Sequence, residues 1–133
     1  MRSENYETTR IENALRDSLV AINADEKVFF NRPKSKQADL EHFIVCNVSG
    51  AVDNLSSAGR CSFQISLFAK DLSNMKNSSR LSVMERAVLS GLPDTIGDCL
   101  VDQDEVRVLG DVPDGNGYHV RVLQVNNVII KSV

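Results

Sequence analysis

The sequence of 133 residues contains no tryptophan, and only 5% of its residues are aromatic. Since 42% of the residues are hydrophobic, the interior must be built from aliphatic side chains. No apolar run approaches the roughly 20 residues that a membrane-spanning helix needs. The first seven residues hold no apolar stretch, so we expect no secretory signal. Length and composition predict one domain, residues 1–133, with a loose polar segment at 1–8.

Charge and cysteine content set further limits. The formal net charge is -3, which argues against nucleic acid as the main partner. The number of cysteines is odd, and Cys46, Cys61 and Cys99 follow neither a zinc spacing nor a redox spacing. We therefore expect reduced thiols, no metal, no cofactor and a cytoplasmic setting.

The clearest element is a strand over residues 60–69. Apolar and polar residues alternate along it, which is typical of a half-buried β-strand. The apolar face holds Cys61, Phe63, Ile65 and Leu67, and the polar face holds Arg60, Ser62, Gln64 and Ser66. We expect an antiparallel sheet that is covered on one side and wet on the other.

Two segments repeat their apolar residues at helical spacing. The first helix is expected over residues 9–23, beginning at a capping box of Thr9 and Glu12. Its apolar face consists of Ile11, Leu15, Leu19 and Ile22. The second helix is expected over residues 79–90. Its apolar face consists of Leu81, Met84, Val88, Leu89 and Leu92.

Two more strands are expected before the second helix. Residues 28–30 form a short one, which ends or lies at an edge because Pro33 follows. Residues 43–48 form the next and pair with residues 60–69 in a hairpin whose turn is centred on Asp53 and Asn54. The resulting cross-strand pairs are Ile44 with Phe63, Cys46 with Cys61 and Val48 with Gly59.

A second hairpin is expected at the end of the chain. Its turn is Asp114-Gly115-Asn116-Gly117, between strands over 106–110 and 118–125. We expect Val120 and Val122 to point inward and Arg121 outward. Further along this segment, apolar residues fall on both faces of the strand. Either a bulge at Asn126-Asn127 restores the alternation between the faces, or another chain covers the outer face.

These elements predict an α+β fold. The sheet is expected to have four to five antiparallel strands, with two helices packed on one face, in the order α-β-β-β-α-β-β.

The sequence holds few candidates for catalysis. His42 and His119 stand beside strand starts, and we interpret both as partly exposed strand-end residues. A nucleophilic pair of Cys46 with His42 is an alternative, although no third orienting group is evident. Cys46 and Cys61 are close enough in the expected register for a disulfide, but two buried thiols are the favoured interpretation.

Opposite charges gather in two segments. Residues 27–36 are basic and residues 94–114 are acidic. Asp98, Asp102 and Asp104 resemble part of a calcium loop, but the required glycine and closing glutamate are missing. The simpler interpretation is that both charged segments are exposed to solvent and unrelated. Alternatively, the basic segment of one subunit contacts the acidic segment of its neighbour in a head-to-tail assembly.

In its order of elements the chain resembles the phage tail terminator family and related small head-to-tail joining proteins. The resemblance covers nearly the whole chain and rests on pattern rather than on a diagnostic motif. The segments that carry it are the first helix around Ile11–Leu15, the strand Val28–Pro33, the strand Phe63–Asp71, the helix around Glu85–Leu89 and the strand Tyr118–Val122. The acidic linker between Gly91 and Glu105 is longer than the family leads us to expect.

The resemblance implies a non-enzymatic protein that forms a ring, typically of six copies, in a phage or prophage tail. Its partners would be further copies of itself, tail-tube subunits and a head-completion protein, in the host cytoplasm during assembly and then in the virion. No membrane and no specific nucleic acid is implied. The surfaces expected to serve as interfaces are Arg32, Lys34, Lys36, Asp53, Asn54, Arg60, Gln64, Asp102, Asp104 and Glu105.

Two other hypotheses stay open. The chain can be a cytosolic α+β module that binds a ligand or a protein and is unrelated to phage, which a deep apolar pocket between helices and sheet would favour. It can also be a small enzyme that uses Cys46 or His119.

Overall fold

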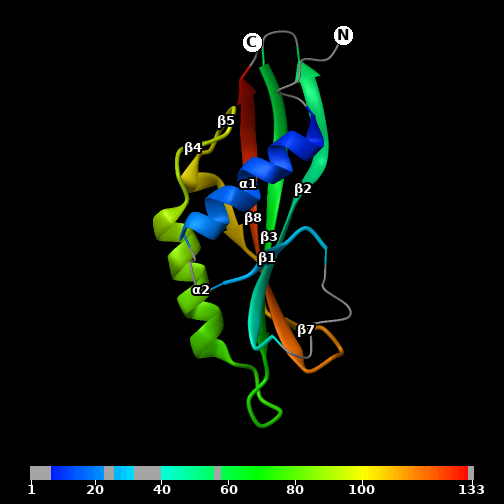
Figure 1. Ribbon diagram of the computed structural model, residues 1–133, viewed down its shortest axis with the longest axis vertical. Coiled ribbons are helices and arrows are strands. Elements are labelled where there is room, and N and C mark those ends of the chain that lie inside the picture. Colours follow the sequence, from blue (N-terminus) through cyan, green and yellow to red (C-terminus); the bar gives the residue numbers. More distant parts are fainter. Residues whose placement is uncertain (1–6, 23–25, 32–39, 56–57, 132–133) are drawn as a thin grey trace.

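The computed structural model describes residues 7–22, 26–31, 40–55 and 58–131, with backbone alone for 50–55 and 58. Three long strands, antiparallel and side by side, run the length of an elongated molecule (Figure 1). They are β2 His42–Leu55, β3 Ala58–Lys70 and β8 Tyr118–Lys131. The strand β3 is central, because it pairs with β2 on one side and with β8 on the other.

Shorter elements complete the sheet and cover one face of it. They are α1 Thr8–Ile22, β1 Val28–Phe29, α2 Ser78–Gly91, β4 Thr95–Ile96, β5 Cys99–Leu100, the 3-10 helix η3 Gln103–Glu105, β6 Val106–Val108 and β7 Val112–Pro113. The strand order is β1-β2-β3-β8-β5-β4, and β6 and β7 also pair with β8. Neither these helices nor any other part of the described chain forms a helix long and apolar enough to cross a membrane.

The expected α+β class with two helices is confirmed, but the expected number of strands is wrong. Within the described residues the sheet has eight strands rather than four or five. The strands that were not predicted are β4, β5 and β7, each two residues long and too short to show a periodic pattern. The strands β5 and β7 pair with β8, and β4 pairs with β5. The short strand β1 does lie at an edge as expected, but it runs parallel to β2.

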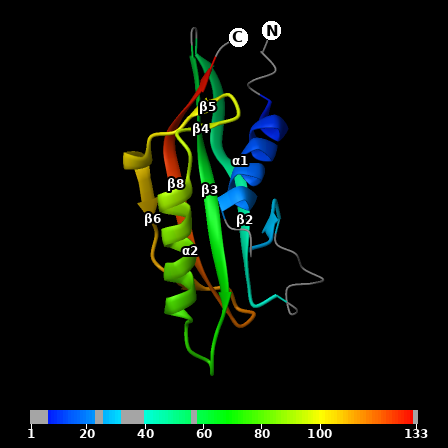
Figure 2. The ribbon, with the colours of Figure 1, turned by 60° about the vertical axis from the view of Figure 1, so that its left-hand side comes forward.

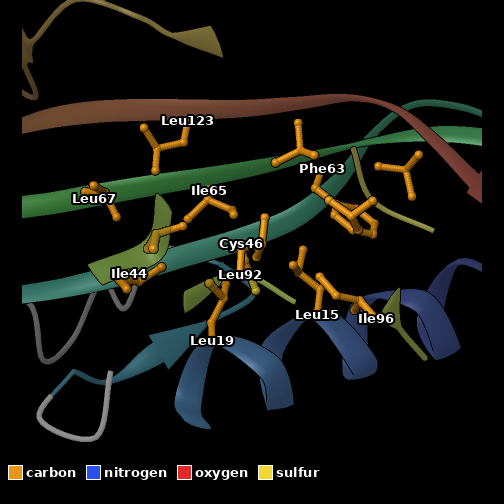
Figure 3. Packing of buried hydrophobic residues seen from close by; sticks show 14 of the residues in the cluster. Leu15, Leu19, Ile44, Cys46, Phe63, Ile65, Leu67, Leu92, Ile96 and Leu123 are labelled. Atoms are coloured by element: carbon orange, nitrogen blue, oxygen red, sulfur yellow. The ribbon is translucent and has the colours of Figure 1, made fainter. Parts of the chain in front are cut away.

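Both helices pack on the same face of the sheet and share one aliphatic core with it (Figure 2). In Figure 3 the side chains of Leu15 and Leu19 extend from α1 toward the sheet, and Leu92 follows the end of α2 among them. The expected apolar face of the first helix is confirmed, with Ile22 half-buried at its end. In the second helix Leu89 is an exception, because its side chain is 36% exposed.

The capping box expected at Thr9 and Glu12 is wrong. The helix α1 begins at Thr8, so Thr9 already lies inside it. The Glu12 carboxylate instead accepts a hydrogen bond from the backbone N–H of Val48, at 3.3 Å. This contact joins the helix to the side of β2 that faces away from β3.

The central strand confirms the alternation on which it was predicted, since Cys61, Phe63, Ile65 and Leu67 are all buried. The hairpin register is different from the expected one. Asp53 and Asn54 lie within β2 rather than in the turn, and they pair with Arg60 and Gly59. The strands continue to Leu55 and from Ala58. The observed pairs are therefore Ile44 with Leu67, Cys46 with Ile65 and Val48 with Phe63.

The face of the sheet away from the helices is not uniformly wet. At one end it carries a second apolar cluster of Phe43, Val45, Phe68, Tyr118 and Val120. The rings of Phe43 and Phe68 stack with centroids 4.6 Å apart, and this cluster is richer in aromatic residues than the helix-covered core, where Phe63 lies. On β3, Arg60 is exposed and Gln64 half-buried, but Ser66 is buried.

The bulge expected at Asn126-Asn127 is confirmed. Between the pairs Cys61 with Val128 and Phe63 with Val125, β8 contains one residue more than β3. Asn127 has a φ of 55°, in the left-handed region that asparagine tolerates better than most residues. The extra residue brings Val128 and Ile130 back onto the helix-covered face that Leu123 and Val125 occupy.

The orientation expected for the first half of β8 is wrong. Val120 belongs to the second cluster and Val122 packs against it, whereas Arg121 lies on the face that the helices cover. Apolar residues stand at 120 and 122 and also at 123 and 125, so either pair can face the helices. The hydrophobic pattern alone gives no reason to prefer one orientation of the strand.

The bulge yields a stability prediction. Asn127→Val should lower the free energy of unfolding by about 1–2 kcal/mol, because a β-branched residue is strained at this φ. Asn127→Gly should leave it unchanged or raise it, since glycine adopts positive φ freely. Urea denaturation of the two variants and the wild type measures the difference. Equal stability of the valine and glycine variants would contradict the assigned backbone conformation.

Candidate functional site

The acidic segment 94–114 runs through β4, β5, η3, β6 and β7, beside β8. Of the basic segment, the structure describes residues 27–31, which contain β1 at the opposite end of the strand order. Its expected interface residues Arg32, Lys34 and Lys36 lie outside the described residues. The described parts of the two segments therefore lie on opposite sides of the sheet.

Three of the predicted interface residues form a compact acidic turn around η3. We call Asp102, Asp104 and Glu105 the acidic turn. The Asp102 side chain caps η3 by accepting a hydrogen bond from the backbone N–H of Asp104, at 2.9 Å. The carbonyl of Asp102 accepts from the N–H of Glu105 at 3.0 Å. Asp104 is exposed, and its carboxylate has no partner among the described residues.

The other predicted interface residues do not form one site. Asp53 and Asn54 lie in the distal part of the β2–β3 hairpin, where Asp53 is the cross-strand partner of Arg60. Gln64 lies in the middle of β3, between Asn47 and Gln124 in the neighbouring strands. These residues share the uncovered face or the hairpin end, away from the acidic turn.

A cluster that the sequence did not indicate joins the start of β2 to α2. Glu26, with its side chain 3% exposed, forms an ion pair with Arg80 and lies 2.6 Å from Nδ1 of His42. Because a carboxylate only accepts, Nδ1 of His42 carries the proton in this contact. Arg80 stands on the first turn of α2, whose N-cap residue Asn77 accepts from the Arg80 N–H at 3.2 Å.

A cavity of about 260 Å³ opens beside this cluster, and we call it the α2 cavity. It is lined by Glu41, His42, Lys70, Leu72, Asn77 and Arg80. The positive charges of Lys70 and Arg80 stand beside the carboxylates of Glu41 and Glu26, so the formal charges of these four side chains cancel. Nε of Arg80 is buried without a hydrogen-bond partner, although Nη2 of the same side chain is engaged by Glu26.

The histidines are partly exposed, as expected, and each is paired with a carboxylate. The side chain of His42 is 25% exposed and that of His119 is 21% exposed. Nδ1 of His119 lies 2.7 Å from the Asp71 carboxylate. Sequence separations of 16 and 48 residues explain why no local pattern indicated these carboxylate partners.

Cys46, the thiol considered as a nucleophile, is not activated. Cys46 is fully buried, and burial raises its pKa to about 12, with the nearby charge of Glu12 acting in the same direction. A thiol with such a pKa stays protonated at neutral pH and reacts poorly. The expected contact between Cys46 and Cys61 is wrong, because the shifted register places Ile65 opposite Cys46. Cys61 is hydrogen-bonded to Cys99 instead, which together with burial raises its pKa.

The acidic residues expected to imitate a calcium loop are not gathered. Asp98 pairs with Arg10 at 3.0 Å, while Asp102 caps η3. Among the described residues no three histidine, cysteine, aspartate or glutamate side chains are placed to hold a metal ion.

Arg121 is the centre of a network of hydrogen bonds and ion pairs. The sequence analysis predicted that this residue lies on the opposite face of the sheet. Its Nε and Nη2 donate to the two oxygens of Asp111, at 2.6 and 2.8 Å, in a bidentate pair. Its Nη1 donates to Glu85 at 3.1 Å and to Ser82 at 3.2 Å, both on α2. Lys76 also reaches Asp111, at 3.1 Å. The network fixes α2 and the β6–β7 connection to β8.

Among the described residues ten large apolar side chains are exposed, and five of them lie in two places. Leu72 and Met75 are 63% and 72% exposed in the tight turn between β3 and α2, which extends beyond the sheet at the bottom of Figure 1. Val108, Leu109 and Val112 are exposed along β6 and β7, on the side where no described strand pairs with them. Exposed apolar residues beside an open strand edge are typical of a surface that binds a partner.

No model of a known protein family matches the sequence, and no curated protein matches it at a significant level. A function for this chain is therefore inferred from its own geometry.

The Arg121 network yields a pH prediction. The Arg121 hydrogen bonds, aided by Lys76, lower the pKa of Asp111 from 3.8 to about 2. Because the pKa is depressed by folding, its stabilising effect is complete above about pH 4 and is lost as the pH falls toward 2. Asp111→Asn should destabilise the protein by about 2 kcal/mol at pH 6, and the difference should shrink toward pH 2.

The control for this measurement is Asp98→Asn, which removes an exposed ion pair and should cost less than about 1 kcal/mol. Urea denaturation of both variants and the wild type across the pH range gives the comparison. A difference for Asp111→Asn that is independent of pH would contradict the assigned charge pairing.

Proposed function

We propose that this chain is a non-enzymatic structural subunit that assembles head to tail into a ring, as the tail terminator of a phage or prophage. The observation that carries the proposal is that the described sheet leaves two different strand edges open, one along β2 and one along β6 and β7, with the acidic turn beside the second. Two different surfaces on opposite sides of a chain can meet between chains. When they are different surfaces, the contact repeats from one subunit to the next and closes into a ring if the rotation permits.

Open strand edges support assembly at these two sides. Beyond Val45, no described strand pairs with the side of β2 that faces away from β3. The outer edges of β6 and β7 are likewise unpaired within the described chain. An unpaired edge offers a row of backbone donors and acceptors to a neighbouring chain. The exposed Val108 and Val112 add apolar contact area to this edge.

The order of the principal elements also supports the proposal. Helix, short strand, long hairpin, helix and final long strand follow one another as in the tail terminator resemblance. The long acidic linker that departs from that pattern contains β4, β5 and η3, and these elements pack along β8 without altering the central sheet. In the proposed ring, the projecting turn of Leu72 and Met75 would meet a tail-tube or head-completion protein.

The alternative of a ligand-binding module depends on a deep apolar pocket between helices and sheet. That space is filled by mutually packed side chains, among them Leu15, Leu19, Ile65 and Leu67, which are fully buried. A cavity of about 680 Å³ lies instead between the C-terminal ends of the two helices, lined mostly by small residues such as Ala21 and Ala87. The packed core between helices and sheet, with the cavity lying outside it, favours assembly over ligand binding.

Light scattering on the purified protein, alone and mixed with a tail-tube protein encoded beside it, tests the proposal. We expect a closed oligomer, six copies in the ring typical of the family, either spontaneously or on contact with the tube protein. A protein that stays strictly monomeric at high concentration and does not bind the tube protein would contradict the proposal.

A matched pair of variants locates the interface. Val108 on β6 and Val83 on α2 have similar exposed fractions, 46% and 44%. Val108→Glu should weaken assembly by about tenfold, because a charge would enter a desolvated strand edge. Val83→Glu should assemble like the wild type. Equal effects of the two substitutions would show that the β6 edge is not the interface.

A further inference from the structure

The outer edge of β2 is covered at one residue by a side chain. Backbone N–H groups alternate in direction along a strand, so those of Ile44 and Val48 point to the same side. The N–H of Ile44 donates to the carbonyl of Lys27 at 2.9 Å, beside β1. Beyond β1 no described strand pairs with this edge, and there the N–H of Val48 donates to the Glu12 carboxylate at 3.3 Å. The carboxylate therefore takes the place that the carbonyl of a neighbouring strand would occupy.

The side chain of Glu12 can leave this position while the helix stays in place. Ile11 and Leu15, on either side of Glu12 in α1, are buried in the core and fix the helix on the sheet. Glu12 itself is half-buried. Its contact with Val48 is a single hydrogen bond, longer than the roughly 2.7–2.9 Å that is usual when the acceptor is charged. Such a bond is readily exchanged for one to another acceptor.

The strand β6 presents matching backbone groups on the other side of the sheet. The N–H of Leu109, just after β6, donates to the carbonyl of Val122 at 2.9 Å, toward β8. By the same alternation the N–H and carbonyl of Val108 point away from β8, where no described strand pairs with β6. The Val108 side chain is 46% exposed. Because β3 and β8 lie between β2 and β6, a bond between Val48 and Val108 joins two chains.

We propose that Glu12 blocks the β2 edge in the free subunit by holding the Val48 N–H, and releases this N–H to the carbonyl of Val108 in a second copy of this chain. The inference rests on the proposed function and names the two strands that meet between neighbouring subunits. An open strand edge pairs with any other strand, and a charged side chain at the edge opposes such pairing. A carboxylate repels an approaching carbonyl oxygen, so the entering strand has to supply further contacts, such as the exposed Val108 side chain.

Hydrogen exchange at single amides, followed by NMR, tests the contact in the monomer. Glu12→Ala should speed exchange at Val48 by about fivefold, because the N–H loses its acceptor. Asp17→Ala is the matched control, since it removes one carboxylate from an exposed position of the same helix and should leave Val48 unchanged. The amide of Leu109 should exchange slowly in every variant, because its bond to Val122 lies within the chain.

Sedimentation equilibrium tests the same residue in assembly, under the conditions in which the wild type assembles. Glu12→Ala should associate about fivefold more strongly than Asp17→Ala, because no competing bond has to be broken. A purely structural role of Glu12 would instead give a less stable fold with equal or weaker association, and urea denaturation measures that stability. In the assembled fraction the amides of Val48 and Val108 should both be protected, in Glu12→Ala as in the wild type.

The outcomes separate the two proposals. Exchange at Val48 that is the same in Glu12→Ala and in the wild type overturns this inference and leaves the ring standing. Association of Glu12→Ala that is no stronger than that of Asp17→Ala does the same. An assembled wild type in which the amide of Val48 or Val108 exchanges as fast as in the monomer also overturns it. A wild type that never associates, alone or with the tube protein, overturns the proposed function and with it this contact.

Discussion

The structure depends on the burial of its central strand from both faces. On the helix side, Phe63, Ile65 and Leu67 of β3 are completely buried beneath α1 and α2. On the other side, Phe68 belongs to the aromatic cluster at one end of the sheet. Each such side chain contributes about 1.5–3 kcal/mol, against a net stability of roughly 5–15 kcal/mol for a typical domain. Exposed ion pairs such as Arg10 with Asp98 add about 1 kcal/mol or less, so the core and not surface charge determines the fold.

The helices and the bulge can be understood as consequences of that burial. The apolar stripe of α1 must meet the apolar row of β2 and β3, and the bulge at Asn126-Asn127 keeps the apolar residues of β8 on the same face beyond it. Polar contacts then fix the arrangement that the core permits. Arg121 ties α2 to β8, and Glu12 satisfies a donor on the open side of β2.

Local patterns in the sequence were sufficient for the elements whose cause is local. Alternation predicts β3 and helical spacing predicts α1. The apolar residues on both faces of the last strand left two alternatives, a bulge or a covering chain, and the structure has the bulge. The hairpin register was missed, because Asp53 and Asn54 suit a turn but the strands continue past them. The partners of Arg121 and Arg80 come from segments 10 to 54 residues away, and no local pattern indicates such pairs. Composition indicates the acidic turn, but the α2 cavity is formed by residues of β2, β3 and α2 together, which no single stretch of sequence contains.

In the proposed ring each subunit uses two different surfaces, and hydrogen exchange in the monomer and in the assembled protein tests this arrangement. Assembly should slow exchange on both sides at once, in the unpaired part of β2 after Val45 and in residues 102–113 around η3, β6 and β7. Protection of one side alone would indicate a symmetric dimer in which a single surface meets itself, and it would contradict head-to-tail assembly.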